Sequence, residues 1–189
     1  MNRLYKSSLM ALVVVLAGAM TCFADPIITS LTGSFADPNE VFLYNLSLPI
    51  DSDVAIQSWG YGGGTNGAGV MIPSGGFDPI IALFDSTGSL FDQNDDGSCP
   101  PGNSAEGCFD PTLNLFLTAG NYTVALSAFF NFPNGPTLAD GFFGLGDFNA
   151  RTGNWAFDVA VSPVPEPATL FLLGTGLASL ASLKRKPTK

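Results

Sequence analysis

The chain has 189 residues, of which 46% are hydrophobic, and its 16 acidic residues outnumber seven basic ones. That length is enough for one domain with its own hydrophobic core. Histidine is absent, which excludes the Ser-His and Cys-His catalytic dyads and every metal site that depends on histidine.

The basic residues lie at the two ends of the chain, and Arg151 is the only one between them. Fifteen of the acidic residues fall between Asp25 and Asp158, so this stretch carries fifteen negative charges against one positive charge, a formal charge of −14. A surface of this charge repels nucleic acid and anionic lipid, and it suits divalent cations. We therefore expect no nucleic-acid partner.

The N-terminus has the pattern of a signal peptide. Arg3 and Lys6 precede an apolar run, Leu9 to Ala19, and small residues lie at positions 22 and 24. This order predicts export of the protein and cleavage after Ala24. Two alternatives remain open, a lipoprotein modified at Cys22 and an N-terminal anchor that is not removed.

Cleavage removes Cys22 and leaves Cys99 and Cys108 as the only cysteines. In an oxidising periplasm we expect these two to form a disulfide. Closing so short a loop contributes about 2–3 kcal/mol if the bond acts on the entropy of the unfolded chain. The alternative is a pair of zinc ligands, for which the chain lacks a histidine and a third thiolate.

The middle of the chain alternates between apolar and polar residues in short runs. In Val41 to Leu48, for example, one face carries Phe42, Tyr44, Leu46 and Leu48. A period of two predicts half-buried β-strands. We expect about eight strands, at 26–35, 41–48, 54–59, 79–84, 89–92, 112–117, 122–128 and 154–161.

These strands predict an all-β fold, an antiparallel β-sandwich of jelly-roll-like form over residues 25–162. A signal helix at 1–24 precedes this domain, and a segment with a transmembrane helix comes after it at 163–189. Residues 60–76 are expected to be a glycine-rich loop without strands, and 129–148 a long connection rich in Gly, Pro and Phe. The glycine-rich loop is not a phosphate loop, because it lacks the Gly-Lys-Ser/Thr ending and no helix comes after it.

Residues 92–97, Asp-Gln-Asn-Asp-Asp-Gly, place oxygen-bearing side chains at alternate positions. This matches the first half of an EF-hand calcium loop, but the twelfth position is Asn103 rather than glutamate and no helices flank the stretch. Two interpretations remain open. One is a solvated acidic turn. The other is a site for calcium as a structural cofactor, whose candidate ligands are Asp78, Asp92, Asn94, Asp96 and Asp110.

No residues are identified as catalytic. Paired carboxylates serve glycosidases, but nothing in the sequence distinguishes one pair among so many acidic residues. We expect no enzymatic activity.

A second candidate site is the aromatic stretch Phe129-Phe130-Asn131-Phe132-Pro133, together with Phe142, Phe143 and Phe148. One interpretation is an exposed platform that stacks on sugar rings or on a partner protein. The other is core that caps the open end of the sandwich. We prefer the second, because so many exposed phenylalanines promote aggregation.

The C-terminal stretch begins with the sequence Val-Pro-Glu-Pro. Pro165 and Pro167 lack an N–H and favour extended backbone, so they predict an exposed, extended tripeptide around Glu166. The uncharged run Ala168 to Leu183 is long enough for a helix of about 24 Å, slightly less than the ~30 Å hydrocarbon core of a bilayer. The basic cluster Lys184-Arg185-Lys186 then predicts a transmembrane helix whose C-terminal end faces the cytoplasm.

This order of motif, short apolar helix and basic end resembles the PEP-CTERM sorting signal, with Pro165, Glu166 and Pro167 as its motif. The resemblance implies processing by exosortase, a membrane-embedded cysteine transpeptidase, in a Gram-negative bacterium that makes extracellular polysaccharide. It implies an inner-membrane-anchored precursor and then a cell-surface or extracellular protein. The alternative is a simple tail anchor on an unprocessed periplasmic protein.

In the body, Ile81-Ala82-Leu83-Phe84-Asp85 is followed by Thr87-Gly88, Asp95-Asp96 and Ala119-Gly120-Asn121-Tyr122. This order of strand, turn, acidic pair and second strand makes residues 78–126 resemble the bacterial pre-peptidase C-terminal domain, an antiparallel, jelly-roll-like sandwich. The resemblance implies an accessory extracellular module, often stabilised by calcium. We expect a structural or binding component associated with exopolysaccharide or with other surface proteins. A carbohydrate-binding or adhesive module is the alternative.

Overall fold

The computed structural model describes residues 25–97, 109–164 and 174–177. Asp25–Val164 is one compact unit, and it holds both sheets and the hydrophobic core. In the second unit, the described residues 174–177 are helical. Within the described ranges no helix is long and apolar enough to cross a membrane. The transmembrane helix predicted at 168–183 lies outside them apart from that one turn, and the predicted signal peptide lies outside them altogether.

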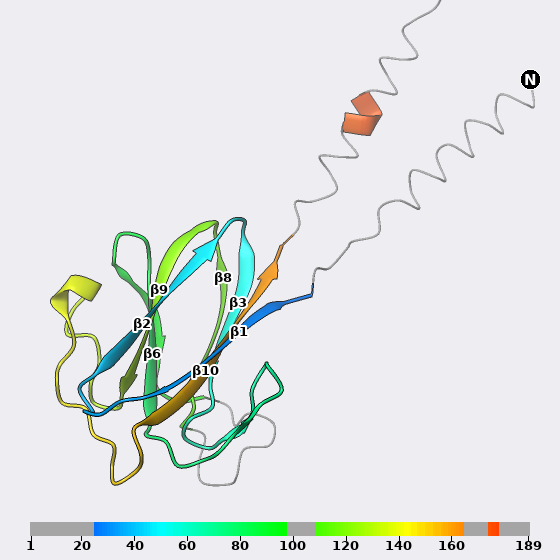
Figure 1. The fold of residues 1–189 in the computed structure, drawn as a ribbon. Coiled ribbons are helices and arrows are strands. Elements are labelled where there is room, and N and C mark those ends of the chain that lie inside the picture. The colour runs from blue at the N-terminus through cyan, green and yellow to red at the C-terminus, as the bar shows by residue number, and fades with distance from the viewer. Residues whose placement is uncertain (1–24, 98–108, 165–173, 178–189) are drawn as a thin grey trace, which may run out of the picture. The chain divides into compact units, whose positions relative to one another are not determined.

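The body is all-β, and its strands form two four-stranded antiparallel sheets and a short hairpin (Figure 1). Sheet A has the strand order β1 (Ile27–Ser34), β10 (Asn154–Pro163), β3 (Ser52–Ser58) and β8 (Thr112–Leu117). Sheet B has the strand order β2 (Val41–Leu48), β9 (Gly120–Ala128), β6 (Pro79–Phe84) and β7 (Leu90–Asn94). The remaining elements are the hairpin strands β4 (Gly64–Thr65) and β5 (Met71–Ile72) and the 3-10 helix η1 (Leu138–Asp140). The predicted all-β, antiparallel fold is confirmed.

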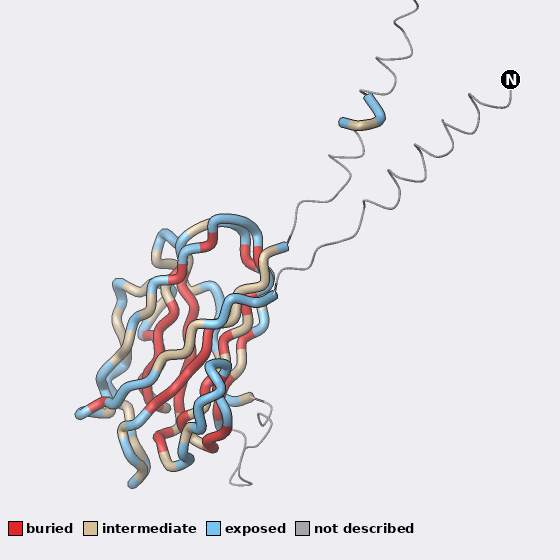
Figure 2. The backbone as a smooth tube through the Cα atoms, turned by 45° about the vertical axis from the view of Figure 1, so that its right-hand side comes forward, coloured by how far each residue is buried: buried red, intermediate tan, exposed pale blue. Residues whose placement is uncertain are grey.

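Alternation along the strands builds the core between the two sheets. Ile56 of β3 is buried, as are Leu46 and Leu48 of β2, whereas Leu43 on the opposite face of β2 is 47% exposed. Both sheets contribute to one continuous cluster of buried side chains, and Figure 2 shows buried positions running along the strands. Two sheets that each bury one face against the other make a β-sandwich.

The outer face of sheet B is covered as well, which explains why every residue of β6 is buried. Ala82 and Phe84 of β6 pack on that face with Leu138 and Phe142, which come from the connection between β9 and β10. The long connection predicted at 129–148 is therefore a layer over sheet B. Its position could not be read from the sequence, because it depends on which strand lies beneath it.

A second segment covers part of the outer face of sheet A. The expectation of a strand-free loop at 60–76 is wrong, because β4 and β5 form a hairpin there. Each of these strands has two residues, too few to show alternation. The Asp158 carboxylate of β10 fixes the segment by accepting hydrogen bonds from the Gly67 N–H at 2.6 Å and the Trp59 indole N–H at 2.8 Å.

Candidate functional site

Acidic side chains converge at the end of the sandwich where β3 and β7 end and β6 and β8 begin, which we call the loop end. Asp78 lies there, directly before β6, and its Oδ1 atom is buried without a hydrogen-bond partner among the described residues. Burial, together with the charges of Asp96, Asp95 and Asp110, raises the pKa of Asp78 to about 7, although the charge of Arg151 acts in the opposite direction. Four carboxylates therefore interact electrostatically at this end.

Asp110 lies two residues before β8 and is fully buried, and both of its carboxylate oxygens accept hydrogen bonds within the body. Its Oδ1 atom accepts hydrogen bonds from the Ser58 hydroxyl at 2.7 Å and the Tyr61 N–H at 3.1 Å. Its Oδ2 atom accepts one from the Gly62 N–H at 2.7 Å. Because hydrogen bonds to a charged acceptor are strong, Asp110 holds the start of the 60–76 segment against sheet A.

The acidic turn after β7 is also organised by local bonds. The Asn94 amide donates to the carbonyl of Thr112 at 3.0 Å, and its oxygen accepts from the Asp96 N–H at 3.3 Å. Burial and the neighbouring Asp95 raise the pKa of Asp96. Asp92 is exposed and accepts a hydrogen bond from the N–H of the next residue, at 2.8 Å.

The structure brings some of the predicted calcium ligands into electrostatic range of one another. Asp78, Asp96 and Asp110 interact, together with Asp95, which the prediction omitted. Within the part of the chain that the structure describes, however, no three His, Cys, Asp or Glu side chains lie close enough to hold a metal ion. The calcium site stays a prediction, and a melting-temperature titration with calcium chloride tests it.

Residues 98–108, which come after this turn, fall outside the described residues. They include Cys99 and Cys108, so the predicted disulfide lies there too. That pairing stays a prediction, which the mass of the unreduced protein checks.

Arg151 is a structural residue of the loop end, a role that its sequence context did not indicate. Its Nε–H donates to the carbonyl of Gly76 at 2.6 Å, and its terminal N–H donates to the carbonyl of Tyr61 at 2.8 Å. The guanidinium carbon lies 3.6 Å from the centroid of the Tyr61 ring, a cation–π geometry. The only signal in the sequence was its position as the lone basic residue in an acidic domain, which does not reveal its hydrogen-bond partners.

The aromatic stretch divides between the two interpretations. Phe142 packs on sheet B, and Phe148 stacks on Phe77 of the core with ring centroids 5.4 Å apart. Phe130 and Phe143, in contrast, are 54% and 52% exposed. The preferred interpretation as core thus holds for part of the set, and these residues cover the outer face of sheet B as well as joining the main core.

The exposed phenylalanines are held by a hydrogen-bonded loop. Asn131 is fully buried; its amide donates to the carbonyl of Asn39 at 3.1 Å and accepts from the Gly144 N–H at 2.8 Å. Phe130, next to it, has a φ of +71°, a left-handed conformation that is unusual for a bulky residue. The loop is therefore fixed by its polar contacts.

The remaining candidate site is the C-terminal segment. The body ends at Val164, whose N–H donates to the carbonyl of Asp51 at 2.9 Å. The predicted tripeptide Pro165, Glu166 and Pro167 comes directly after it, outside the described residues. Comparison with known families identifies the segment.

Residues 163–186 match the PEP-CTERM protein-sorting motif. The PEP-CTERM resemblance inferred from the sequence is thus confirmed for this segment. The match spans the proline-bounded tripeptide, the apolar run and the basic cluster Lys184-Arg185-Lys186. It begins at Pro163, the last residue of β10, and so overlaps only the last two residues of the body.

Among solved structures, the chain is similar to the pre-peptidase C-terminal domain of a collagenase from Bacillus anthracis. The similarity has a TM-score of 0.37 and 12% sequence identity, and it covers 70% of this chain and 87% of that one. A likeness at this level carries no argument about ligands or activity. No curated protein matches the chain.

Proposed function

We propose that this protein is an exported precursor that exosortase processes at its PEP-CTERM segment, and that its β-sandwich body is a non-catalytic component of the cell surface or extracellular matrix. The observation that carries the proposal is the sorting-motif match at 163–186, which begins within the last two residues of a compact body that ends at Val164. A domain with its own core is a suitable cargo, because removal of the segment behind it leaves that core unchanged.

The parts of the chain have separate roles in this proposal. The signal peptide at 1–24 exports the chain. The apolar helix at 168–183 and the basic residues behind it hold the precursor in the inner membrane. The two prolines keep Glu166 extended and accessible to the processing enzyme. The released body then associates with exopolysaccharide or with other surface proteins.

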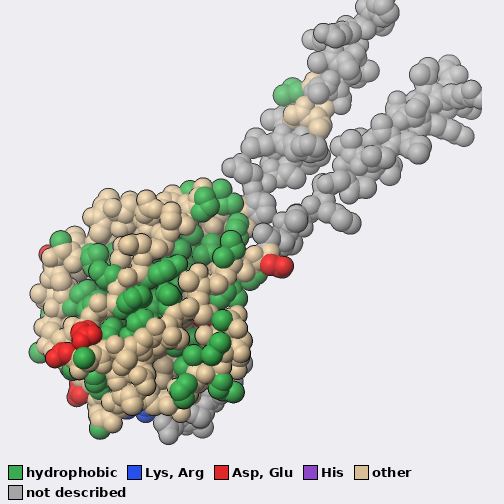
Figure 3. All heavy atoms as spheres, in the orientation of Figure 1, with side chains coloured by type: hydrophobic (Ala, Val, Ile, Leu, Met, Phe, Trp, Pro, Cys, Tyr) green, Lys and Arg blue, Asp and Glu red, His purple; other side chains and the backbone are tan. Residues whose placement is uncertain are grey.

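The non-catalytic role is supported by what the carboxylates of the body do. Asp110 and Asp158, the buried acidic residues of the described chain, each accept hydrogen bonds that fix the 60–76 segment. The chain offers no histidine as a base. These two acidic residues therefore supply structure, and Figure 3 shows other acidic side chains scattered over the face in view.

The test is a triple substitution, Pro165→Ala, Glu166→Ala and Pro167→Ala, expressed in a host that contains exosortase. The wild-type protein is expected in the extracellular or surface fraction with a mature C-terminus that lacks Lys189. The variant is expected to stay in the membrane fraction with Lys189 intact. The matched control is Pro187→Ala, a proline substitution just beyond the matched segment, which should leave localisation unchanged.

Fractionation and the intact mass of each species separate the outcomes. A triple variant that reaches the surface with the wild-type C-terminus contradicts processing at this motif. A wild-type protein that keeps Lys189 at its final location supports the alternative of an unprocessed, membrane-anchored periplasmic protein.

A further inference from the structure

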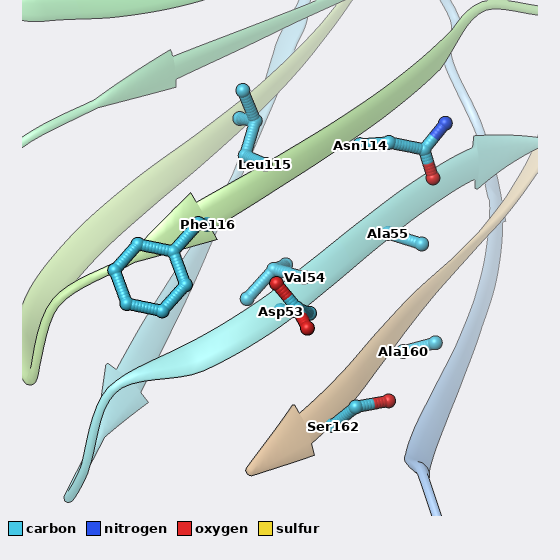
Figure 4. A pocket seen from close by; sticks show the side chains of 8 residues that line it. All are labelled: Asp53, Val54, Ala55, Asn114, Leu115, Phe116, Ala160 and Ser162. Atoms are coloured by element: carbon cyan, nitrogen blue, oxygen red, sulfur yellow. The ribbon is translucent and has the colours of Figure 1, made fainter. Parts of the chain in front are cut away.

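The outer face of sheet A carries a hollow of about 300 Å³ beside the part that the 60–76 segment covers (Figure 4). Two neighbouring cross-strand rows line it on β8, β3 and β10. One row is Phe116, Asp53 and Ser162, and the other is Asn114, Ala55 and Ala160. The hollow is thus a surface feature of three adjacent strands.

Two alanines produce the hollow. Ala55 and Ala160 are register partners on β3 and β10, and partners in an antiparallel pair lie about 4.5–5.5 Å apart. Figure 4 shows both methyl groups pointing the same way as Ser162. On one side of these two alanines lie the larger side chains of Phe116 and Asp53, which form one wall of the hollow. On the other side stands Gln57, which accepts a hydrogen bond from the Thr112 hydroxyl.

An aromatic ring stands at the edge of the hollow. Phe116 is 56% exposed, whereas its neighbour Leu117 is buried in the core. The alternation of β8 therefore points Phe116 outward, on the edge strand of sheet A. Its position opposite Asp53 in the register sets an apolar ring beside a carboxylate.

The polar side chains around the hollow are available to a ligand. Asp53, Asn114 and Ser162 have no side-chain hydrogen bond to any other described residue. The carboxylate accepts hydrogen bonds, and the amide and the hydroxyl can each donate and accept. The two alanines, the exposed Phe116 ring and the unpaired polar groups together make a site that has one apolar wall and several hydrogen-bonding groups.

We propose that this hollow binds one residue of a neutral polysaccharide. A sugar ring has an apolar C–H face that can lie against Phe116, and hydroxyl groups that can pair with Asp53, Asn114 and Ser162. The proposal takes its biological setting from the proposed surface role, since a matrix protein meets extracellular polysaccharide.

Size and charge favour this occupant over others. A stable protein interface buries about 800 Å² on each partner, far more than two rows of side chains on three strands provide. The body carries a formal charge of −14, and Asp53 adds a carboxylate at the hollow itself, so an anionic polymer is repelled. A neutral sugar needs no such large interface and is not repelled by the negative charge.

The experiment is an NMR titration of residues 25–164, the compact unit that contains the complete core. The probes are cellohexaose, laminarihexaose, maltohexaose and chitohexaose, with a hexamer of galacturonic acid as the anionic probe. At least one neutral probe should shift amide signals at 53–55, 114–116 and 160–162, and the anionic probe should not. Phe116→Ala should weaken binding about tenfold, and Ala160→Phe should abolish it by filling the hollow.

The matched control is Phe143→Ala, which removes a phenylalanine of similar exposure from the other covering layer and should leave binding unchanged. The proposal is overturned if none of the neutral probes shifts these signals, or if Phe143→Ala weakens binding while Phe116→Ala does not. It is also overturned if the same signals shift with protein concentration alone, since a second copy then occupies this face. These results leave the processing assay untouched, so the two proposals fail separately.

Discussion

At the scale of single residues, the buried carboxylates of the body hold a loop in place by accepting hydrogen bonds from it. Asp110 accepts three hydrogen bonds from Ser58, Tyr61 and Gly62, all about fifty positions earlier in the chain. Asp158 acts in the same way on Trp59 and Gly67. The 60–76 segment thus depends on two acidic side chains.

Replacement of Asp110 by Asn should destabilise the body by about 2–4 kcal/mol, because the amide cannot accept all three hydrogen bonds and leaves a buried polar group badly paired. Urea unfolding of residues 25–164 measures the change. The control is Asp53→Asn, an exposed carboxylate, for which a change within about 0.5 kcal/mol is expected. Equal effects of the two substitutions contradict the role given to Asp110.

Asp78 should make the stability of the body depend on pH. Its folded pKa of about 7 lies above the ordinary value of 3.8, so between these values the folded state binds more protons than the unfolded state. Stability should therefore fall as the pH rises from about 4 to 7 and stay low above it. In buffer with a calcium chelator, Asp78→Asn should raise stability at pH 8 by about 1–2 kcal/mol, because the amide has no charge to bury. The gain is smaller than the full pKa shift implies, since solvent screens the charge of a side chain that is only partly buried.

Urea unfolding at pH 5 and pH 8 checks this prediction, with Asp147→Asn at an exposed turn as the control. A variant that gains as much at pH 5 as at pH 8 shows that charge on Asp78 is not the cause.

At the scale of elements, β1 contains a glycine that the packing requires. A Cβ atom at Gly33 would lie 2.3 Å from the nearest indole carbon of Trp155. Gly33 and Trp155 are also register partners in sheet A. The tryptophan side chain therefore occupies the space that a side chain at position 33 would need.

Gly33→Ala should cost about 1–3 kcal/mol, because Trp155 must leave its position and disturb the aromatic contacts around it. Near-ultraviolet circular dichroism and urea unfolding report the two effects. Gly120→Ala in β9 is the control, since the nearest atom to its Cβ would lie at an ordinary contact distance of 3.7 Å. A stable Gly33→Ala protein with unchanged tryptophan signals would contradict this account of the packing.

The strands of the two sheets were largely predictable from the sequence. The segments that cover the outer faces of the sheets, 60–76 and 129–148, were not. The alternation in 41–48 and 112–117 predicts β2 and β8 with their boundaries, because a sheet with one buried face requires a period of two. The β4–β5 hairpin leaves no such pattern and rests on contacts with residues far along the chain, such as Asp158.

The candidate sites were also only partly predictable, because they depend on contacts between residues that are distant in the sequence. Composition and local spacing drew attention to the acidic turn at 92–97, but the bonds of Asp110 reach residues about fifty positions away. The hollow at Ala55 and Ala160 depends on the neighbourhood of β3 and β10, which no local pattern in either strand reveals. The sorting motif was predictable because it is a linear signal.

At the scale of the whole molecule, the body is a compact unit with a core of its own. It ends at Val164, and its core is complete within Asp25–Val164. Deletion of residues 165–189 should therefore leave the melting temperature of the body unchanged and leave the protein soluble in the periplasm. Fractionation and thermal unfolding test both parts, with the full-length chain as reference. A truncated protein that unfolds, or that still reaches the surface, contradicts this division of the chain.

β10 runs through the interior of sheet A, paired with β1 on one side and β3 on the other, and the chain leaves the body at its end. Tension applied through Val164 is therefore directed along β10, perpendicular to its hydrogen bonds. Both ladders must then shear at once rather than open one bond at a time. The strand through which the body would be tethered is thus held on both of its edges against mechanical extraction.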